Sequence, residues 1–203
     1  IKLNHEDAVP VSGTLLATLA ERTNKIEFNR IELRAGRSRY RFTGAIGPRP
    51  AGQPPGYRYE LVSRGSLMAP GDSSEPDLPA MMSISGGIDP DGRRISADQL
   101  GIATGQGEVF GTAGLLLEPG KTPGVDLSLA VNRMPVGHAK TIWPWFVAPG
   151  ARRWAMQHVF GGVLENTQIR LDAEPGFFGQ GVPLDAERLE ATFHLSGTRF
   201  DVA

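Results

Sequence analysis

The stretch VDLSLAV, residues 125–131, decides the fold class. Valine or leucine stands at each odd-numbered position, and the positions between them hold Asp126, Ser128 and Ala130. Successive side chains of a β-strand point to opposite faces, so this alternation predicts a strand with one apolar and one polar face.

The same period of two recurs along most of the chain. A slip in the pattern at Asn29–Arg30 predicts a β-bulge, which would keep Ile26, Phe28, Ile31 and Leu33 on one face. The turn sequence DPDG at 89–92 predicts a hairpin. We expect strands at about 11–20, 25–35, 40–46, 57–63, 82–88, 94–102, 109–117, 125–131, 169–171, 189–195 and 198–202.

Composition supports strands over helices. The chain has 26 Gly and 16 Pro, about a fifth of its 203 residues against a usual share of about 12%. Both residues break helices, and one short helix is predicted near 149–160, from Pro149 to the Gly161-Gly162 break. The predicted fold is mainly β: an antiparallel meander of amphipathic strands forming a curved, elongated open sheet or groove. A closed sandwich remains the alternative.

The domain organisation follows from a faint repeat. The segment 30–36 resembles the segment 99–105 at an offset of 69 residues, which predicts two β-meander repeats, 1–68 and 80–136. The segment 69–79, rich in Pro, Ser and acidic residues, is expected to be a mobile loop with little to bury. Residues 137–203 add an aromatic and helical segment and further strands. We expect one continuous elongated domain that is a fragment of a larger protein, because the chain starts at Ile1 rather than Met and its last strand reaches the end.

The sequence has few residues arranged for catalysis. It contains 21 Lys and Arg against 22 Asp and Glu, which argues against a basic surface for nucleic acid. Without Cys it has no disulfide and no thiolate metal site, and its four His residues have no metal-ligand spacing. The G-x-S-x-G, P-loop and dinucleotide-binding motifs are missing. We therefore expect no enzyme, no metal, no cofactor and no nucleic-acid partner.

The apolar strand faces exceed what one helix can cover. A helix of about 12 residues is about 18 Å long, too short for ten or so strands. Three alternatives remain for the rest of the apolar surface. It folds on itself, it is covered by another part of the protein or by a partner, or it binds an apolar ligand such as acyl chains. The candidate groove residues are Ile31, Leu33, Phe42, Leu100, Ile102, Leu127, Leu129 and Phe193.

All three tryptophans, Trp143, Trp145 and Trp154, lie in one segment around the predicted helix. They could form an aromatic platform for a sugar, a lipid or a membrane interface, or they could pack as a seam between helix and sheet. The packing interpretation predicts that Trp154 is buried, so that Trp154→Ala would cost roughly 3–5 kcal/mol of stability.

The segment IWPWFVAPGARRW (142–154), followed by GGVL (161–164), IRL (169–171) and LEATFHLSG (189–197), resembles the AsmA-like family of large Gram-negative envelope proteins. The resemblance implies a protein held in the inner membrane by an N-terminal helix absent here and extending into the periplasm. It also implies similarity to bridge-like lipid transfer proteins, whose β-sheet groove carries phospholipid between inner and outer membrane. Phospholipid acyl chains and the rest of the parent chain would then be the partners. A structural or assembly module of the envelope is the alternative.

Overall fold

The computed structural model describes residues 10–143, 148–179 and 187–201. Two helices are present in these ranges, α1 (Val136–Ile142) and α2 (Pro149–His158), with a 3₁₀ turn at Phe177–Gly179. The strands are β1 (Val11–Ala20), β2 (Lys25–Ala35), β3 (Ser38–Pro48), β4 (Tyr57–Met68), β5 (Leu78–Ile88), β6 (Arg94–Thr104), β7 (Gly107–Leu116), β8 (Gly124–Pro135), β9 (Val159–Phe160), β10 (Val163–Ala173), β11 (Leu189–Ser196) and β12 (Arg199–Phe200).

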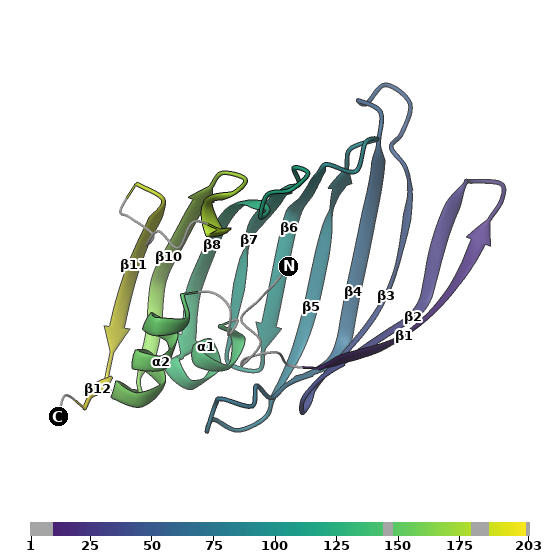
Figure 1. Ribbon diagram of the computed structural model, residues 1–203. Helices are drawn as coiled ribbons and strands as arrows, with labels where there is room; N and C mark the ends of the chain where they lie inside the picture. The colour runs from purple at the N-terminus through teal and green to yellow at the C-terminus, as the bar shows by residue number, and fades with distance from the viewer. Residues whose placement is uncertain (1–9, 144–147, 180–186, 202–203) are drawn as a thin grey trace.

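Ten of the strands form a single antiparallel sheet in the order β1-β2-β3-β4-β5-β6-β7-β8-β10-β11 (Figure 1). Strands β9 and β12 pair apart from it. The sheet is open, with β1 and β11 at its edges, so the mainly β prediction is confirmed and the closed alternative is wrong. At the predicted 89–92 hairpin, the Gly92 amide donates to the Asp89 carbonyl at 2.9 Å and Gly92 adopts φ +69°.

The bulge predicted in β2 is present, and β6 carries its counterpart. Between β2 and β3 the register jumps from Phe28 opposite Gly44 to Ile31 opposite Phe42. Between β6 and β7 the jump runs from Ala97 opposite Ala113 to Leu100 opposite Gly111, and each of these four positions lies 69 residues further along. The shift at Leu16/Ala17 in β1 likewise matches that at Ser85/Gly86 in β5. Strands β1–β3 and β5–β7 therefore share one register pattern.

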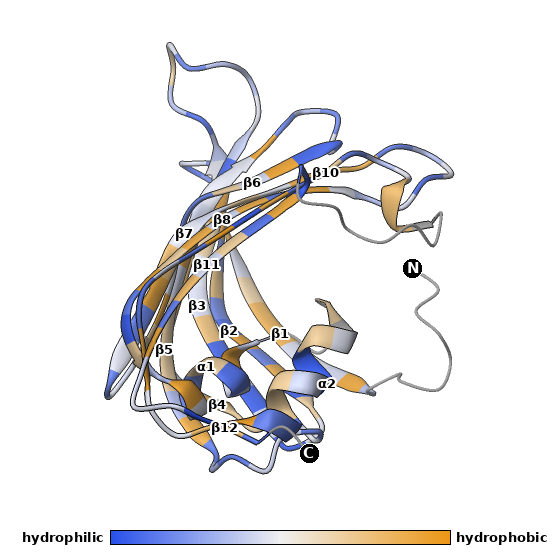
Figure 2. Ribbon diagram, turned by 90° about the vertical axis from the view of Figure 1, so that its left-hand side faces the viewer, coloured by the Kyte–Doolittle hydropathy of each residue, from blue (hydrophilic) through white to orange (hydrophobic). Residues whose placement is uncertain are grey.

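The sheet bends along its strands into an arc, and the helices lie inside it (Figure 2). The predicted helix corresponds to α2, which stops at His158 because Val159 and Phe160 join β12. Helix α1 was not predicted, since its sequence VGHAKTI is short and rich in β-branched residues. It forms where Ile142 packs against the buried cluster of Met68, Leu78, Ala80 and Met82, so tertiary contacts rather than propensity stabilise it.

The segment 69–77 differs from the mobile loop expected from its composition. Ala69 and Ser73 are buried, and the Ala69 amide donates to Ser38 Oγ at 2.9 Å. Asp72 and Glu75 contact the helices through ion pairs described below. Composition could not predict that this segment is ordered, because its acidic residues bind partners more than sixty positions away in sequence.

The aromatic seam is only partly visible, because Trp145 lies outside the described residues. Trp143 is half-buried after α1, where its amide donates to the Ala139 carbonyl. The predicted burial of Trp154 is wrong: it is 47% exposed and its ring lies 5.5 Å from that of His158. Helix α2 turns Arg152 rather than Trp154 toward the protein interior.

This exposure lowers the expected effect of removing the ring. Trp154→Ala should cost about 1 kcal/mol of unfolding free energy, because half of the side chain already contacts solvent. Thermal unfolding followed by circular dichroism would measure it. A loss near that of a fully buried tryptophan would mean that the ring makes an interior contact in solution.

Candidate functional site

One row of cross-strand neighbours runs the whole width of the sheet and is entirely apolar. It passes through one residue of each of the ten strands, and each pair of neighbours is in direct register. Its members, from β1 to β11, are Ala17, Phe28, Gly44, Leu61, Ile84, Leu100, Gly111, Leu129, Ile169 and Ala191.

A second row runs beside the first on the same face. It consists of Leu19, Ile26, Ile46, Tyr59, Gly86, Ala97, Ala113, Leu127, Leu171 and Leu189. The one polar group, the Tyr59 hydroxyl, donates to the Ser96 carbonyl at 2.9 Å. Burial, with the nearby Asp98 carboxylate, raises the pKa of Tyr59, so this hydroxyl stays neutral.

The two rows are long on the scale of a lipid. Ten strands make nine spacings of about 4.8 Å, so each row extends about 43 Å along the axis of the arc. One leaflet of a bilayer contributes about 15 Å of hydrocarbon, half of the ~30 Å core. The apolar face is therefore longer than one extended acyl chain.

All eight candidate groove residues lie on this face. Leu100 and Leu129 belong to the first row and Leu127 to the second. The others occupy the neighbouring rows of the same face: Ile31 opposite Phe42, Leu33 opposite Tyr40, Ile102 opposite Met82 and Val109, and Phe193 alternating with Ala191 on β11. Leu33 and Phe193 are exposed, and the other six are half-buried.

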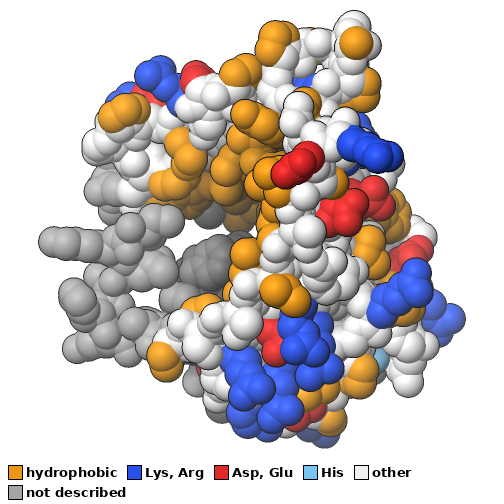
Figure 3. Space-filling model, turned by 90° about the vertical axis from the view of Figure 1, so that its right-hand side faces the viewer, with side chains coloured by type: hydrophobic (Ala, Val, Ile, Leu, Met, Phe, Trp, Pro, Cys, Tyr) orange, Lys and Arg blue, Asp and Glu red, His pale blue; other side chains and the backbone are white. Residues whose placement is uncertain are grey.

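The apolar face is the hollow side of the arc, which we call the trough. In Figure 3, hydrophobic side chains gather inside the hollow and charged side chains lie on the outer surface. At the β1 end the trough is open to solvent through Val11, Leu15, Leu19 and Ile26, each of which is exposed. Soluble proteins rarely expose a continuous apolar surface of this extent unless it binds something.

The outer face of the sheet is mostly polar, although Leu16, Met81 and Phe110 are exposed on it. Glu60, Ser85 and Gln99 are neighbours in register there, and Glu32 makes ion pairs with Arg30 at 3.6 Å and Arg41 at 3.2 Å. Water therefore contacts one face, while the other presents hydrocarbon. A half-solvated antiparallel sheet ordinarily buries its second face against another layer.

The helices cover only part of the trough. Ile142 of α1 packs against two buried clusters, one around Met82 and Leu78 and one around Val109 and Val131. His138 of α1 lies with Nδ1 3.1 Å from Thr104 Oγ1, and burial lowers its pKa. Its imidazole is therefore neutral near pH 7, and no ionised group of α1 other than Lys140 lies over the sheet.

Two buried cations secure the helices, and sequence reasoning missed both. Arg152 Nη2 lies 2.7 Å from Asp72 Oδ1, and Lys140 Nζ lies 3.3 Å from Glu75 Oε1. The two carboxylates come from the 69–77 segment. No rule based on sequence spacing predicts pairs between residues so far apart. The only signal in the sequence was that the 69–77 segment is acidic and that the segment of the predicted helix is basic.

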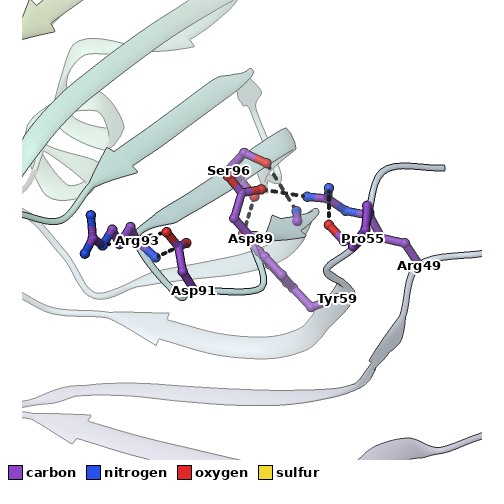
Figure 4. Close-up of polar contacts among 8 residues, drawn as sticks. Arg49, Pro55, Tyr59, Asp89, Asp91, Arg93 and Ser96 are labelled. Atoms are coloured by element: carbon purple, nitrogen blue, oxygen red, sulfur yellow. Dashed lines mark hydrogen bonds and ion pairs between the residues drawn. The ribbon is translucent and has the colours of Figure 1, made fainter.

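A polar cluster at the rim of the sheet is the other conspicuous feature (Figure 4). Arg49 bridges the β3–β4 and β5–β6 connections, with Nη2 3.4 Å from Asp89 Oδ1 and Nη1 3.4 Å from the Pro55 carbonyl. A Cβ at Gly87 would collide with the Arg49 guanidinium, so glycine there lets the side chain lie flat on the sheet. The cluster holds two connections together and contains no nucleophile paired with a base.

Within the described ranges, no group of His, Asp or Glu side chains could hold a metal ion. Among the same residues, neither helix is long and apolar enough to cross a bilayer. Comparison of the chain with protein-family models, with curated proteins and with solved structures gives no match.

Proposed function

We propose that this chain binds phospholipid acyl chains along the trough, as a non-catalytic segment of a periplasmic AsmA-like protein that carries lipid between the inner and outer membranes. One observation supports the proposal above all others. Two adjacent rows of apolar residues cross all ten strands in register and remain open to solvent at the β1 end.

The energetics favour an acyl chain as the occupant. Each methylene removed from water contributes about 0.8 kcal/mol, so ten methylenes laid along the first row contribute about 8 kcal/mol before the cost of ordering the chain. The rows contain no fixed charge that would demand a specific polar partner. Such a surface favours long hydrocarbon chains and does not discriminate between one hydrocarbon chain and another.

The open side of the trough suits a lipid that carries a polar headgroup. Burying a phosphate without partners is unfavourable, whereas a headgroup at the open side remains hydrated while its acyl chains lie on the sheet. In Figure 2 the described strands curve around one side of the arc and do not close into a barrel. A phospholipid therefore matches the trough better than a fully apolar ligand, which would gain from complete enclosure.

The placement in the envelope comes from the resemblance to AsmA-like proteins, and the local structure is compatible with it. Residues 144–147 of the segment that carries the resemblance lie outside the described residues, and its described part forms helix α2, the short strand β9, a Gly161-Gly162 turn with φ of +63° and +75°, and then β10. Both glycines adopt a backbone conformation that other residues rarely reach. The order helix, glycine break and strand thus has a structural basis in this chain.

Lipid that accompanies the protein through purification would test the proposal directly. We expect native mass spectrometry of protein extracted from a Gram-negative envelope to show adducts with the masses of phospholipids. Delipidated protein should regain them from vesicles of phosphatidylethanolamine and phosphatidylglycerol. Protein that carries no lipid and takes none from vesicles would contradict the proposal and favour the structural or assembly role.

A further inference from the structure

The connection 69–77 between β4 and β5, which we call the strap, contacts both helices. Asp72 of the strap pairs with Arg152 of α2, and Glu75 pairs with Lys140 of α1. The strap is itself anchored to the sheet, because Ala69 is buried and bonded to Ser38. Each helix is therefore tied to the sheet by one ion pair through the same short segment.

The two helices are also bound to each other. Arg152 Nη1 donates to the Lys140 carbonyl at 3.1 Å, and Lys140 Nζ donates to the Met156 carbonyl at 3.4 Å. The Lys140 ammonium lies 4.8 Å from the centre of the Phe160 ring. These contacts make α1, α2 and the strap one mechanical unit, so loosening the strap would affect both helices.

This unit lies over apolar residues that would otherwise extend the open trough. Ile142 and Ile102 both pack against the buried clusters that contain Met82 and Val109, and Ile102 lies in register between these two residues. Met82 and Val109 are buried, while Leu100, two residues from Ile102 on the same face, is half-buried. Ile102 is half-buried like Leu100, so the covered part of the trough is marked by Met82 and Val109, which belong to the clusters that Ile142 packs against.

The ion pairs are asymmetric in their exposure. The side chains of Arg152 and Lys140 are 2% and 5% exposed, whereas those of Asp72 and Glu75 are 51% and 27% exposed. Solvent and salt reach the carboxylate side of each pair, while the cations lie among protein atoms. In addition, Arg152 Nε is buried and has no hydrogen-bond partner among the residues that the structure describes. Because an unpaired buried donor is unfavourable, the closed arrangement is not fully satisfied.

We propose that the Asp72–Arg152 and Glu75–Lys140 pairs form a latch that holds α1 and α2 closed over the trough, and that release of this latch sets how fast acyl chains enter the covered part. The proposal rests on the acyl-binding function proposed above. Loss of either pair would leave a cation in the interior without a partner, which is strongly disfavoured, so release of the pairs favours opening of the helices that carry Arg152 and Lys140.

The test replaces the carboxylates and leaves the buried cations in place. The variant Asp72→Asn/Glu75→Gln keeps the shape of both side chains and removes their charge. The matched control is Asp77→Asn at the end of the same connection, where Asp77 pairs with Arg37 at 3.0 Å and both side chains are well exposed. Circular dichroism would verify that each variant retains the strand content of the chain without substitutions, which is called the parent chain in these experiments.

Two readouts separate the latch from acyl binding. Amide hydrogen exchange reports opening of α1 and α2, and we expect the double variant to accelerate it at least about tenfold, as expected when charged hydrogen bonds are lost. Uptake of cis-parinaric acid, a fluorescent fatty acid, reports filling of the trough and should become faster by a similar factor. In the parent chain, uptake should also accelerate as salt screens the pairs, and this salt dependence should vanish in the double variant.

Each outcome decides the proposal. Faster exchange and faster uptake in the double variant, with Asp77→Asn unchanged, support it. Unchanged exchange overturns the latch, and faster exchange with unchanged uptake overturns its control of the trough while acyl binding stands. If neither the parent chain nor any variant takes up the probe, the acyl-binding function fails, and the gating proposal fails with it.

Discussion

We expect Leu127→Asp to abolish acyl binding while the protein still folds. Leu127 lies in the second apolar row, half-buried between Ala113 and Leu171, and it is not part of the buried clusters beneath the helices. A carboxylate there would meet hydrocarbon without a partner whenever lipid is bound. The loss should exceed about 3 kcal/mol, or roughly a hundredfold in affinity for a fatty-acid probe.

The neighbouring residue provides the control. Ser128→Asp introduces the same charge one position along β8, where the side chain points to the polar outer face and is exposed. Its affinity for the probe should match that of the parent chain. In a cell, Leu127→Asp should eliminate the proposed lipid-carrying function without lowering the abundance of the protein, and Leu129→Asp, whose side chain packs beside Val109 and Val131, should eliminate it as well. Retained function in both variants would contradict a lipid path at this point of the trough.

The largest effect on stability should come from Met134→Ala. Met134 is fully buried, at 0% exposure, where the end of β8 packs with Val109 and Val131 beneath α1. Truncation would leave a cavity between helix and sheet and should cost about 2–5 kcal/mol. For a chain of this size the melting midpoint should fall by about 5–15 °C.

A second methionine isolates the effect of burial. Met81→Ala removes the same atoms from the outer face of β5, where the side chain is 56% exposed. Its melting midpoint should change by no more than about 2 °C. If the two variants have the same melting midpoint, the helices do not cover the end of β8 in solution. The latch proposal would then fail, because the helices would not be closed over the trough.

Local patterns were sufficient to predict most of the strands and the faces they present, although β9 was read as the end of a helix and the first half of β10 was not predicted. The alternation in 125–131 placed Leu127 and Leu129 together, and the slip at Asn29–Arg30 marked the bulge that keeps Ile31 aligned with Phe28. These predictions succeeded because strand period and bulge position are properties of consecutive residues. The same reasoning placed all eight candidate residues on one face, since each strand was read in its own register.

Predictions that depended on distant partners were less successful. Helix α1 has a weak local signal and forms on a surface supplied by β5, β6 and β8. Trp154 looked like a core residue by composition, yet the interior position on α2 belongs to Arg152, whose partner Asp72 lies 80 residues earlier. A hydrophobicity argument cannot anticipate a buried arginine whose carboxylate comes from another part of the chain.

The sequence by itself determined that this protein is a β-meander with one apolar face, because alternation and turn residues act over a few positions. The tertiary structure decided that the face remains an open trough, because curvature depends on how ten strands twist and bulge together. It also decided which part of the trough is covered, since the helices are held there by two ion pairs to the strap. Both features depend on contacts between residues that are distant in sequence, and such contacts cannot be predicted from a local sequence pattern.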